Sequence, residues 1–279
     1  MRYDPVKDQL GRILGRHPLL ERVFFALLHL IFLRSWHVRR ALRRILIRWP
    51  SDQPVRVLDA GTGFGQYAYY IARRYPQAEV VGVDVKAEYL ERARRFFAHT
   101  PLAARVRFEV DDLTQLRTKG PFDLILAVDV LEHIPDDQAV LRHFARVLQP
   151  GGFVVIHTPS DQGGSDVHAP GMQSFISEHV REGYSRELLE ARLREAGLEP
   201  LESHYSYGPF GSLAWRLLVK RPMLWLNRSR AAYLLLPLYY ALVLPIGLVL
   251  HVLDLYQDNR RGTGLLVVAQ KPHTAVSTR

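Results

Sequence analysis

The sequence predicts an α/β fold, with helices covering both faces of a mostly parallel β-sheet. Between residues 55 and 160, short runs rich in β-branched residues alternate with stretches of helical periodicity. Most of these runs are apolar without alternation, as expected of strands that are buried on both faces. Of the 279 residues, 48% are hydrophobic and 23% charged, which is ordinary for a folded chain and too apolar for a disordered one.

Two helical stretches precede the first strand. Residues 18–33 are apolar nearly all round and too short to span a bilayer, which needs about 20 residues. We therefore expect this stretch to be buried in protein or to lie in a membrane interface. From residue 38 to residue 49, apolar residues recur at helical spacing while arginines occupy the other face, and Pro50 ends the helix.

Strands and helices are then expected in regular succession. The first five strands are expected at Val55–Leu58, Val80–Val83, Arg105–Val110, Leu124–Val128 and Phe153–His157. The helices between them are expected at Gln66–Tyr75, Ala87–Ala98 and Gln138–Leu148. Ser185 is a suitable N-cap for a helix over Arg186–Ala196. Pro200–Tyr207 and Gly264–Gln270 follow as the sixth and seventh strands.

About 55 residues separate the last two strands, and they include a long uncharged stretch. Ala231–Leu253 would extend about 34 Å as a straight helix, enough to cross a bilayer. If the sixth and seventh strands pair in one sheet, however, both ends of this insertion return to the same side, which a single span does not allow. Pro237, Pro245 and Gly247 permit a bend. We expect a re-entrant or in-plane membrane element, with a hydrophobic lid or dimer interface as the alternative.

Positive charge is concentrated in two parts of the chain. The formal net charge is +9; residues 1–50 hold eleven Arg and Lys against three acids, and residues 203–253 hold five against none, which leaves −4 for the remainder. Both basic segments are rich in bulky apolar residues, a combination that fits an anionic membrane surface better than a nucleic acid. No secretory signal is visible, so we expect a cytoplasmic protein, peripheral or monotopic on the inner face of the membrane. The absence of cysteine excludes a disulfide framework, thiolate catalysis and Cys-based metal sites.

A glycine-rich turn directly follows the first strand. In Val57-Leu-Asp-Ala-Gly-Thr-Gly-Phe-Gly65, three alternating glycines allow the backbone to turn tightly and to approach a ligand closely. The helix that begins near Gln66 would direct its free N–H groups at that ligand. Asp84 ends the second strand, where a carboxylate can accept hydrogen bonds from a ribose diol. Further acids follow the third and fourth strands, at the edge where open parallel sheets bind ligands.

Together these motifs resemble those of the class I S-adenosylmethionine-dependent methyltransferases. The resemblance rests on Asp59–Gly65, Asp84, Asp112-Leu113, Phe122–Pro135 and Leu148–Val154, and it covers about residues 55–207 and 262–272. It implies a Rossmann-like, doubly wound, seven-stranded sheet with N-terminal helices and a hydrophobic helical insertion between strands 6 and 7. The implied division is 1–50 for the N-terminal helices, 51–207 plus 262–279 for the methyltransferase domain, and 208–261 for the insertion.

The resemblance also implies which residues bind the cofactor, S-adenosylmethionine. They are Asp59, Gly61, Gly63, Gly65, Asp84, Asp112, Leu113, Asp129 and Val130. The glycines would pack against the methionine part, Asp84 would bind the ribose, and Asp112 and Leu113 would meet the adenine. Asp129 and Val130 would line the wall beside the sulfonium. Asp111 is explained equally well as the cap of a turn.

Methyl transfer mainly requires in-line positioning, and a hydroxyl acceptor also requires a base. The predicted catalytic residues are His133, His179 and Tyr184, with His157 and His168 as further candidates. In this family the loop after the fifth strand borders the acceptor pocket, so Phe175, His179 and Arg181 could touch the acceptor; pairing of Arg181 with Glu178 or Glu182 is the alternative. Asp129, Glu132 and His133 are similar to a magnesium-holding cluster of some O-methyltransferases, but a fourth ligand is not identifiable and no metal is expected.

The resulting functional hypothesis is methylation of a hydrophobic small molecule or lipid-like acceptor at a membrane surface, without a nucleic-acid partner. The alternatives are an RNA or protein methyltransferase that docks through its basic N-terminus, a soluble methyltransferase with a hydrophobic lid, and a non-catalytic binder. The charge of −4 outside the basic segments argues against the first of these. The acceptor atom and the oligomeric state stay open.

Overall fold

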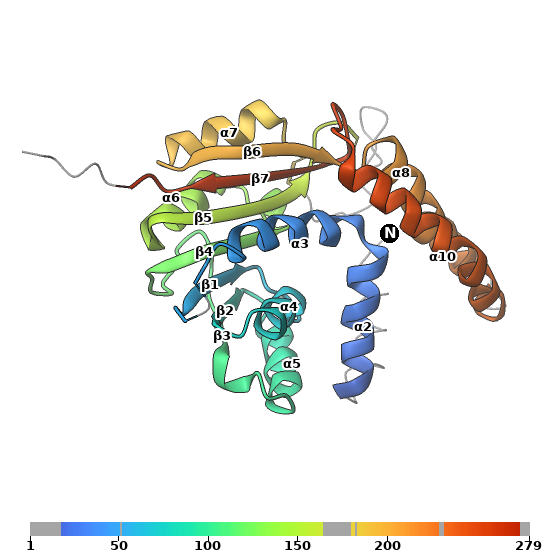
Figure 1. The fold of residues 1–279 in the computed structure, drawn as a ribbon, viewed down its shortest axis with the longest axis horizontal. Coiled ribbons are helices and arrows are strands. Elements are labelled where there is room, and N and C mark those ends of the chain that lie inside the picture. Colours follow the sequence, from blue (N-terminus) through green and yellow to red (C-terminus); the bar gives the residue numbers. More distant parts are fainter. Residues whose placement is uncertain (1–17, 51, 164–179, 182, 229–231, 274–279) are drawn as a thin grey trace, which may run out of the picture.

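The computed structural model describes residues 18–273, apart from residues 51, 164–179, 182 and 229–231. Seven strands form one sheet with the order β3-β2-β1-β4-β5-β7-β6 (Figure 1). The first five strands run parallel to one another, whereas β7 is antiparallel to both β5 and β6. The predicted seven-stranded, mostly parallel sheet is confirmed.

The strands lie close to their predicted positions. They are β1 (Val55–Ala60), β2 (Ala78–Asp84), β3 (Val106–Val110), β4 (Phe122–Val128), β5 (Leu148–Pro159), β6 (Glu199–Ser206) and β7 (Gly264–Gln270). Six of the seven residues of β4, and six of the seven of β7, are buried, which explains why their sequences are apolar without alternation apart from Asp123 and Gln270. β5 begins five residues before the predicted Phe153, because Leu148 already pairs with Phe122 ahead of a register shift.

Helices pack on both faces of the sheet and enclose two hydrophobic cores. One face carries α3 (Leu33–Leu46), α4 (Gln66–Arg74) and α5 (Ala87–Ala98), and the other carries α6 (Asp137–Val147) and α7 (Arg186–Glu195). The short turns η1 (Ala103–Arg105) and η2 (Leu131–His133) lie in the connections. Ser185 caps α7 as predicted, since its side chain accepts a hydrogen bond from the Leu188 N–H.

The apolar stretch before the first strand forms α2 (Pro18–Ile31), which has two different faces. On one face Phe25 packs against Tyr69 and Phe96, and the buried Glu21 pairs with Arg92 of α5 at 2.8 Å. The other face is exposed; we call it the α2 face, and it consists of Leu19, Leu20, Val23 and Leu27. This stretch is thus apolar nearly all round although only one of its faces packs against the protein, and the other face is exposed.

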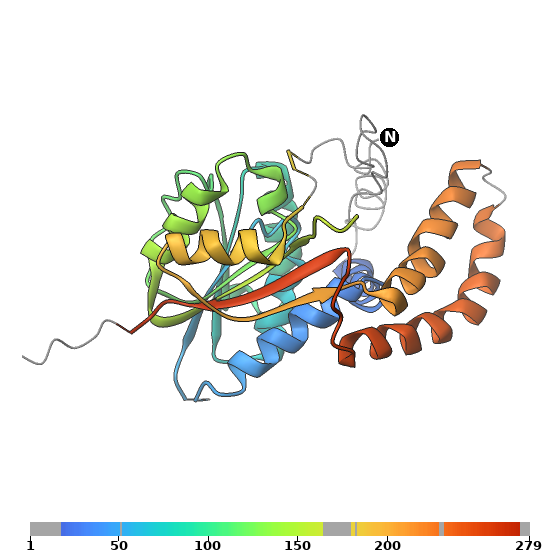
Figure 2. The same cartoon turned by 90° about the horizontal axis from the view of Figure 1, so that it is seen from above.

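A helical arm leaves the sheet after β6 and returns to it at β7. Its elements are α8 (Pro209–Trp215), the π-helical turn η3 (Arg216–Lys220), α9 (Arg221–Arg228) and α10 (Ala232–Tyr256). Ser206 at the end of β6 pairs with Gly264 at the start of β7, so the arm begins and ends at the same edge of the sheet. Figure 2 shows α10 beside α8 and α9, and the Tyr239 and Tyr240 hydroxyls donate to the backbone of η3.

Candidate active site

The turn after β1 is shaped by glycines with left-handed backbone. Gly61 and Gly63 have φ of 74° and 55°, values that L side chains rarely adopt. A Cβ on Gly61 would lie 2.3 Å from Val130 Cγ2, whereas a Cβ on Gly63 would meet no described atom within 4 Å. The turn therefore packs against the loop after β4 at Gly61 and leaves space for a ligand at Gly63.

Asp59 holds this turn from inside. Its Oδ2 accepts hydrogen bonds from the Thr62 hydroxyl at 2.6 Å and from the Ala68 N–H at 3.1 Å. Burial raises the pKa of Asp59 to about 6, because desolvation disfavours the charged carboxylate. The hydrogen bonds show that Asp59 orders the turn, and its predicted contact with the cofactor stays a prediction.

Asp84 lies beside the same turn. Its Oδ2 accepts from the Gly63 N–H at 2.9 Å, and its Oδ1 accepts from the Lys86 N–H at 2.9 Å. Each carboxylate oxygen has a second lone pair, so both can accept a further hydrogen bond. The carboxylate is thus fixed next to the open space at Gly63, where the resemblance places a ribose.

The neighbouring acids after β3 have different tasks. Burial acts to raise the pKa of Asp111, but hydrogen bonds from Thr118, Arg117 and Asp112 outweigh it and lower that pKa. Asp111 is therefore the cap of this loop. Asp112 is exposed, with one oxygen accepting from Thr114, and Leu113 is buried behind it.

Asp129, directly after β4, is held from two sides. Its Oδ1 lies 3.0 Å from His157 Nδ1, and its Oδ2 lies 2.8 Å from a guanidinium nitrogen of Arg34. On its far side the His157 ring lies 3.0 Å from the Ser206 hydroxyl and is 3% exposed. Sequence reasoning missed Arg34, since nothing distinguishes it there from the other arginines of residues 1–50.

Glu132 and His133 lie on η2, next to Asp129. Glu132 is 1% exposed, and its Oε2 accepts from the Thr158 hydroxyl at 3.1 Å. Burial, and then the Asp129 charge, raise the pKa of Glu132 to about 8, so it holds a proton near neutral pH. His133 is a third exposed, with Nε2 3.9 Å from Glu132 Oε1. Among the described residues, no three His, Asp or Glu side chains are placed to hold a metal ion.

Glu132→Gln is expected to remove a pH-dependent loss of stability. Because the pKa of Glu132 is about 8 in the folded chain and ordinarily 4.5, protonated Glu132 favours folding below pH 4.5, and this contribution is lost as the pH rises through 8. Between about pH 5 and pH 9, wild type should therefore lose about 4 kcal/mol more of its unfolding free energy than the variant. Urea denaturation at a series of pH values measures this; parallel curves for both proteins would contradict it.

Not all predicted catalytic residues reach this site. Tyr184 is fully buried, and its hydroxyl donates to Asp137 and to the Leu131 carbonyl. Burial and the Asp137 carboxylate raise the pKa of Tyr184, so this phenol belongs to the core and is unsuited to act as a base. Arg181 also pairs with Asp137, and its predicted partners Glu178 and Glu182 lie outside the described residues. His168, Phe175 and His179 lie outside the described residues.

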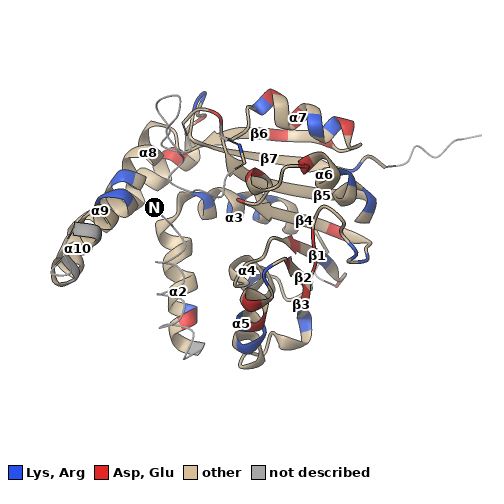
Figure 3. Ribbon diagram, turned by 180° about the vertical axis from the view of Figure 1, so that it is seen from behind, with Lys and Arg blue, Asp and Glu red and all other residues tan. Residues whose placement is uncertain are grey.

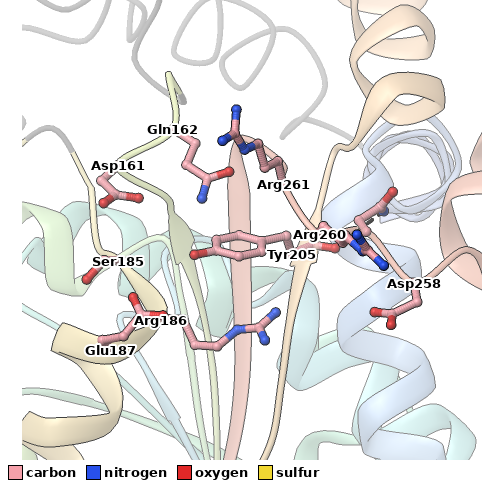
Figure 4. Close-up of a pocket in the computed structure, with 10 residues that line it drawn as sticks. Asp161, Gln162, Ser185, Arg186, Glu187, Tyr205, Asp258, Arg260 and Arg261 are labelled. Carbon is pink, nitrogen blue, oxygen red and sulfur yellow. Dashed lines mark hydrogen bonds between the residues drawn. The ribbon is translucent and has the colours of Figure 1, made fainter.

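A cavity of about 350 Å³ lies between the loop after β5, the start of α7 and the segment before β7 (Figure 4). Its lining residues are Asp161, Gln162, Ser185, Arg186, Glu187, Tyr205, Asp258, Asn259, Arg260 and Arg261. The Arg186 guanidinium lies 4.9 Å from the centre of the Tyr205 ring. Neither Asp84 nor Asp129 lines this cavity, and its charged walls do not suit an apolar acceptor.

Comparisons with known proteins agree with the site and the fold. Residues 57–152 match a family model described as "Methyltransferase domain". Trans-aconitate 2-methyltransferase of Azoarcus sp. (strain BH72) is 38% identical over 120 residues, which are 43% of this chain and 45% of that protein. 27-O-demethylrifamycin SV methyltransferase of Amycolatopsis mediterranei is 31% identical over 60% of this chain and 61% of its own length. The chain thus spans about half the length of the curated relatives it matches.

Among solved structures, a putative sarcosine dimethylglycine methyltransferase from Galdieria sulphuraria is similar with a TM-score of 0.58. The two chains are 20% identical, and the likeness covers 86% of this chain and 84% of the other. At this identity the comparison shows the fold.

Proposed function

We propose that this chain, which carries a class I S-adenosylmethionine-dependent methyltransferase domain, methylates a hydrophobic small molecule or lipid-like acceptor at an anionic membrane surface. The domain follows from the family match and the fold. The membrane surface and the acceptor class are our proposal. Two exposed apolar surfaces, the α2 face and a larger one on the helical arm, are attached to the ligand-binding edge of the sheet, and this observation supports the proposal.

The residues of the turn fit the methyl donor. The free space at Gly63, the fixed carboxylate of Asp84 and the exposed Asp112 lie at one edge of the sheet, as an adenosyl group requires. When bound, S-adenosylmethionine supplies a methyl group on a positively charged sulfur. In the proposed site Asp84 holds the ribose hydroxyls, Asp112 and Leu113 meet the adenine, and Asp129 and Val130 line the reacting side. His133 is the proposed base for a hydroxyl acceptor, at its imidazole nitrogen.

The arm supplies the larger apolar surface. We call it the α10 face; its side chains are 55–85% exposed, and they are Leu234, Leu235, Leu238, Leu242, Ile246 and Val249. Residues Leu234–Tyr256 form a helix that is long and apolar enough to cross a membrane, with a mean hydropathy of 2.0. Soluble monomers rarely expose apolar patches larger than a few hundred Å². Because the arm returns to the sheet, insertion into one leaflet suits it better than a crossing.

Both apolar surfaces are connected to the site. The joint between α2 and α3 is tied to Asp129 by Arg34, and the arm begins just after Ser206, which is linked to Asp129 through His157. Figure 3 shows Lys and Arg on the arm at η3 and α9, beside the almost uncharged α10. Basic residues next to apolar ones favour an anionic lipid surface on the cytoplasmic face. An acceptor dissolved in that surface would have a short path to the site.

The relatives support a small-molecule acceptor over RNA or protein, since their names refer to trans-aconitate and to a demethylrifamycin. The test is to incubate the protein with tritiated S-adenosylmethionine and vesicles made from a bacterial lipid extract. We expect tritium in the organic phase only when vesicles are present. We expect none when Asp84→Ala replaces the wild-type protein. Mass spectrometry then identifies the labelled compound. Label confined to water-soluble products, or to added RNA or protein, would contradict the proposal.

A further inference from the structure

Arg34 connects the N-terminal helices to the edge of the sheet where ligands bind. It lies in the first turn of α3, outside the segment that matches the methyltransferase family model. One guanidinium nitrogen is 2.8 Å from Asp129 Oδ2, and the Arg34 backbone N–H donates to the Tyr207 hydroxyl at 3.1 Å. Its side chain is 23% exposed, so the ion pair with Asp129 is partly shielded from water.

The same turn of α3 also meets the glycine-rich segment. The Ser35 hydroxyl lies 3.2 Å from the Tyr67 hydroxyl, and the Gln66 side chain donates to Ser35 at 3.5 Å. Gln66 and Tyr67 directly follow the turn after β1. The first turn of α3 thus contacts the segments after β1, β4 and β6, which are the ones that surround a ligand in an open parallel sheet.

Asp129 needs support from outside its own loop. Its φ of 52° lies in the left-handed region, which is uncommon for residues other than glycine. One of its carboxylate oxygens faces His157 and the other faces Arg34. Because two partners on different elements hold both oxygens, the plane and direction of this carboxylate are determined by the fold rather than by the loop.

We propose that Arg34 is a positioning residue of the methyltransferase site, which acts by holding the Asp129 carboxylate in the orientation that faces the donor. This rests on the proposed function, in which Asp129 lines the reacting side. A carboxylate held at a fixed position beside a positively charged sulfur stabilises it without reorganising on binding. Without Arg34, Asp129 loses the ion pair at Oδ2, and its carboxylate is less firmly held in that orientation.

The test is a double-mutant cycle on donor affinity, measured by calorimetry with S-adenosylmethionine. The proteins are wild type, Arg34→Gln, Asp129→Asn and the double variant. We expect each single variant to bind the donor about 10-fold more weakly, as for the loss of one charge-assisted hydrogen bond. The double variant should bind no more weakly than Asp129→Asn, because Arg34 acts through Asp129. Effects that multiply to about 100-fold, or an unchanged Arg34→Gln, would overturn the inference.

Two further variants separate positioning from general stability. Arg34→Lys keeps the charge and should restore donor affinity to within about 3-fold of wild type. Trp36→Phe removes the hydrogen bond that the indole N–H donates to the Leu30 carbonyl, a contact of the same turn that involves neither Asp129 nor the glycine-rich segment, so it should lower the unfolding temperature of the donor-free protein and leave donor affinity unchanged. An equal loss of affinity in Trp36→Phe would overturn the inference. If wild type does not bind the donor at all, the proposed function fails with it; if only the Arg34 effects are missing, the proposed function stands.

Discussion

Replacing Leu234, Leu238 and Leu242 by Gln is expected to abolish binding of the protein to anionic vesicles. These leucines are 85%, 65% and 65% exposed, so they contribute little to the protein core. Each would bury its side chain in lipid, which is worth about 1.5–3 kcal/mol. Three of them amount to about 4 kcal/mol or more, so the partition coefficient should fall at least about 100-fold. Flotation with vesicles that contain phosphatidylglycerol measures this, and Gln keeps the helix propensity high.

A matched control uses exposed apolar residues on other surfaces. Ile47, Leu188 and Leu201 are 75%, 42% and 55% exposed and lie outside the arm. Their replacement by Gln should leave vesicle binding unchanged. If the α10 face is instead an interface between two copies of the chain, wild type will elute as a dimer without binding vesicles, and the leucine variant will elute as a monomer. That result would contradict the membrane proposal.

Gly61→Ala is expected to destabilise the fold more than Gly63→Ala. Both positions have left-handed backbone, which costs a residue with a Cβ about 1–2 kcal/mol. Only the new Cβ at Gly61 would collide with Val130, and such overpacking costs about a further 1–3 kcal/mol. We expect a loss of about 3 kcal/mol for Gly61→Ala and about 1 kcal/mol for Gly63→Ala, measured by urea denaturation.

The contact with Val130 can be tested independently. Val130→Ala removes the methyl groups that would collide with the new Cβ. In the Gly61→Ala background it should therefore restore about 1–2 kcal/mol of the unfolding free energy. The same substitution should give no recovery in the Gly63→Ala background. Equal losses for the two glycine variants, or equal recovery in both, would mean that Val130 does not limit the space at Gly61.

The sheet and the glycine-rich turn after β1 could be predicted because their signals are local. Strand and helix patterns alternate along the chain, and the glycines and Asp84 lie at fixed positions relative to strand ends. Parallel strands bring those ends to one edge of the sheet, so residues that are far apart in the sequence lie close together there. The pairing of the two strands that flank the arm, which is the premise of the argument against a single membrane crossing, is also confirmed.

The partners of Asp129 could not be predicted in this way. Arg34 precedes it by 95 residues in the sequence and lies on a helix whose packing decides which arginine meets the loop. For Tyr184, the sequence did not indicate the direction of the side chain. Its N–H donates to the Pro159 carbonyl, which aligns this segment with the end of β5 and turns the ring toward Asp137 of α6. The sequence places Tyr184 near the site but does not say to which side the ring points.

The most direct test of the central claim is calorimetric binding of S-adenosylmethionine to wild type and to Asp84→Ala. We expect one site per chain in wild type. Affinity should be about 100-fold lower in the variant, because the two charge-assisted hydrogen bonds that we propose between Asp84 and the ribose would be lost together with the support of Gly63. Asp161→Ala, in the separate polar cavity, should bind like wild type. Failure of wild type to bind the donor, or equal affinity in Asp84→Ala, would contradict the account.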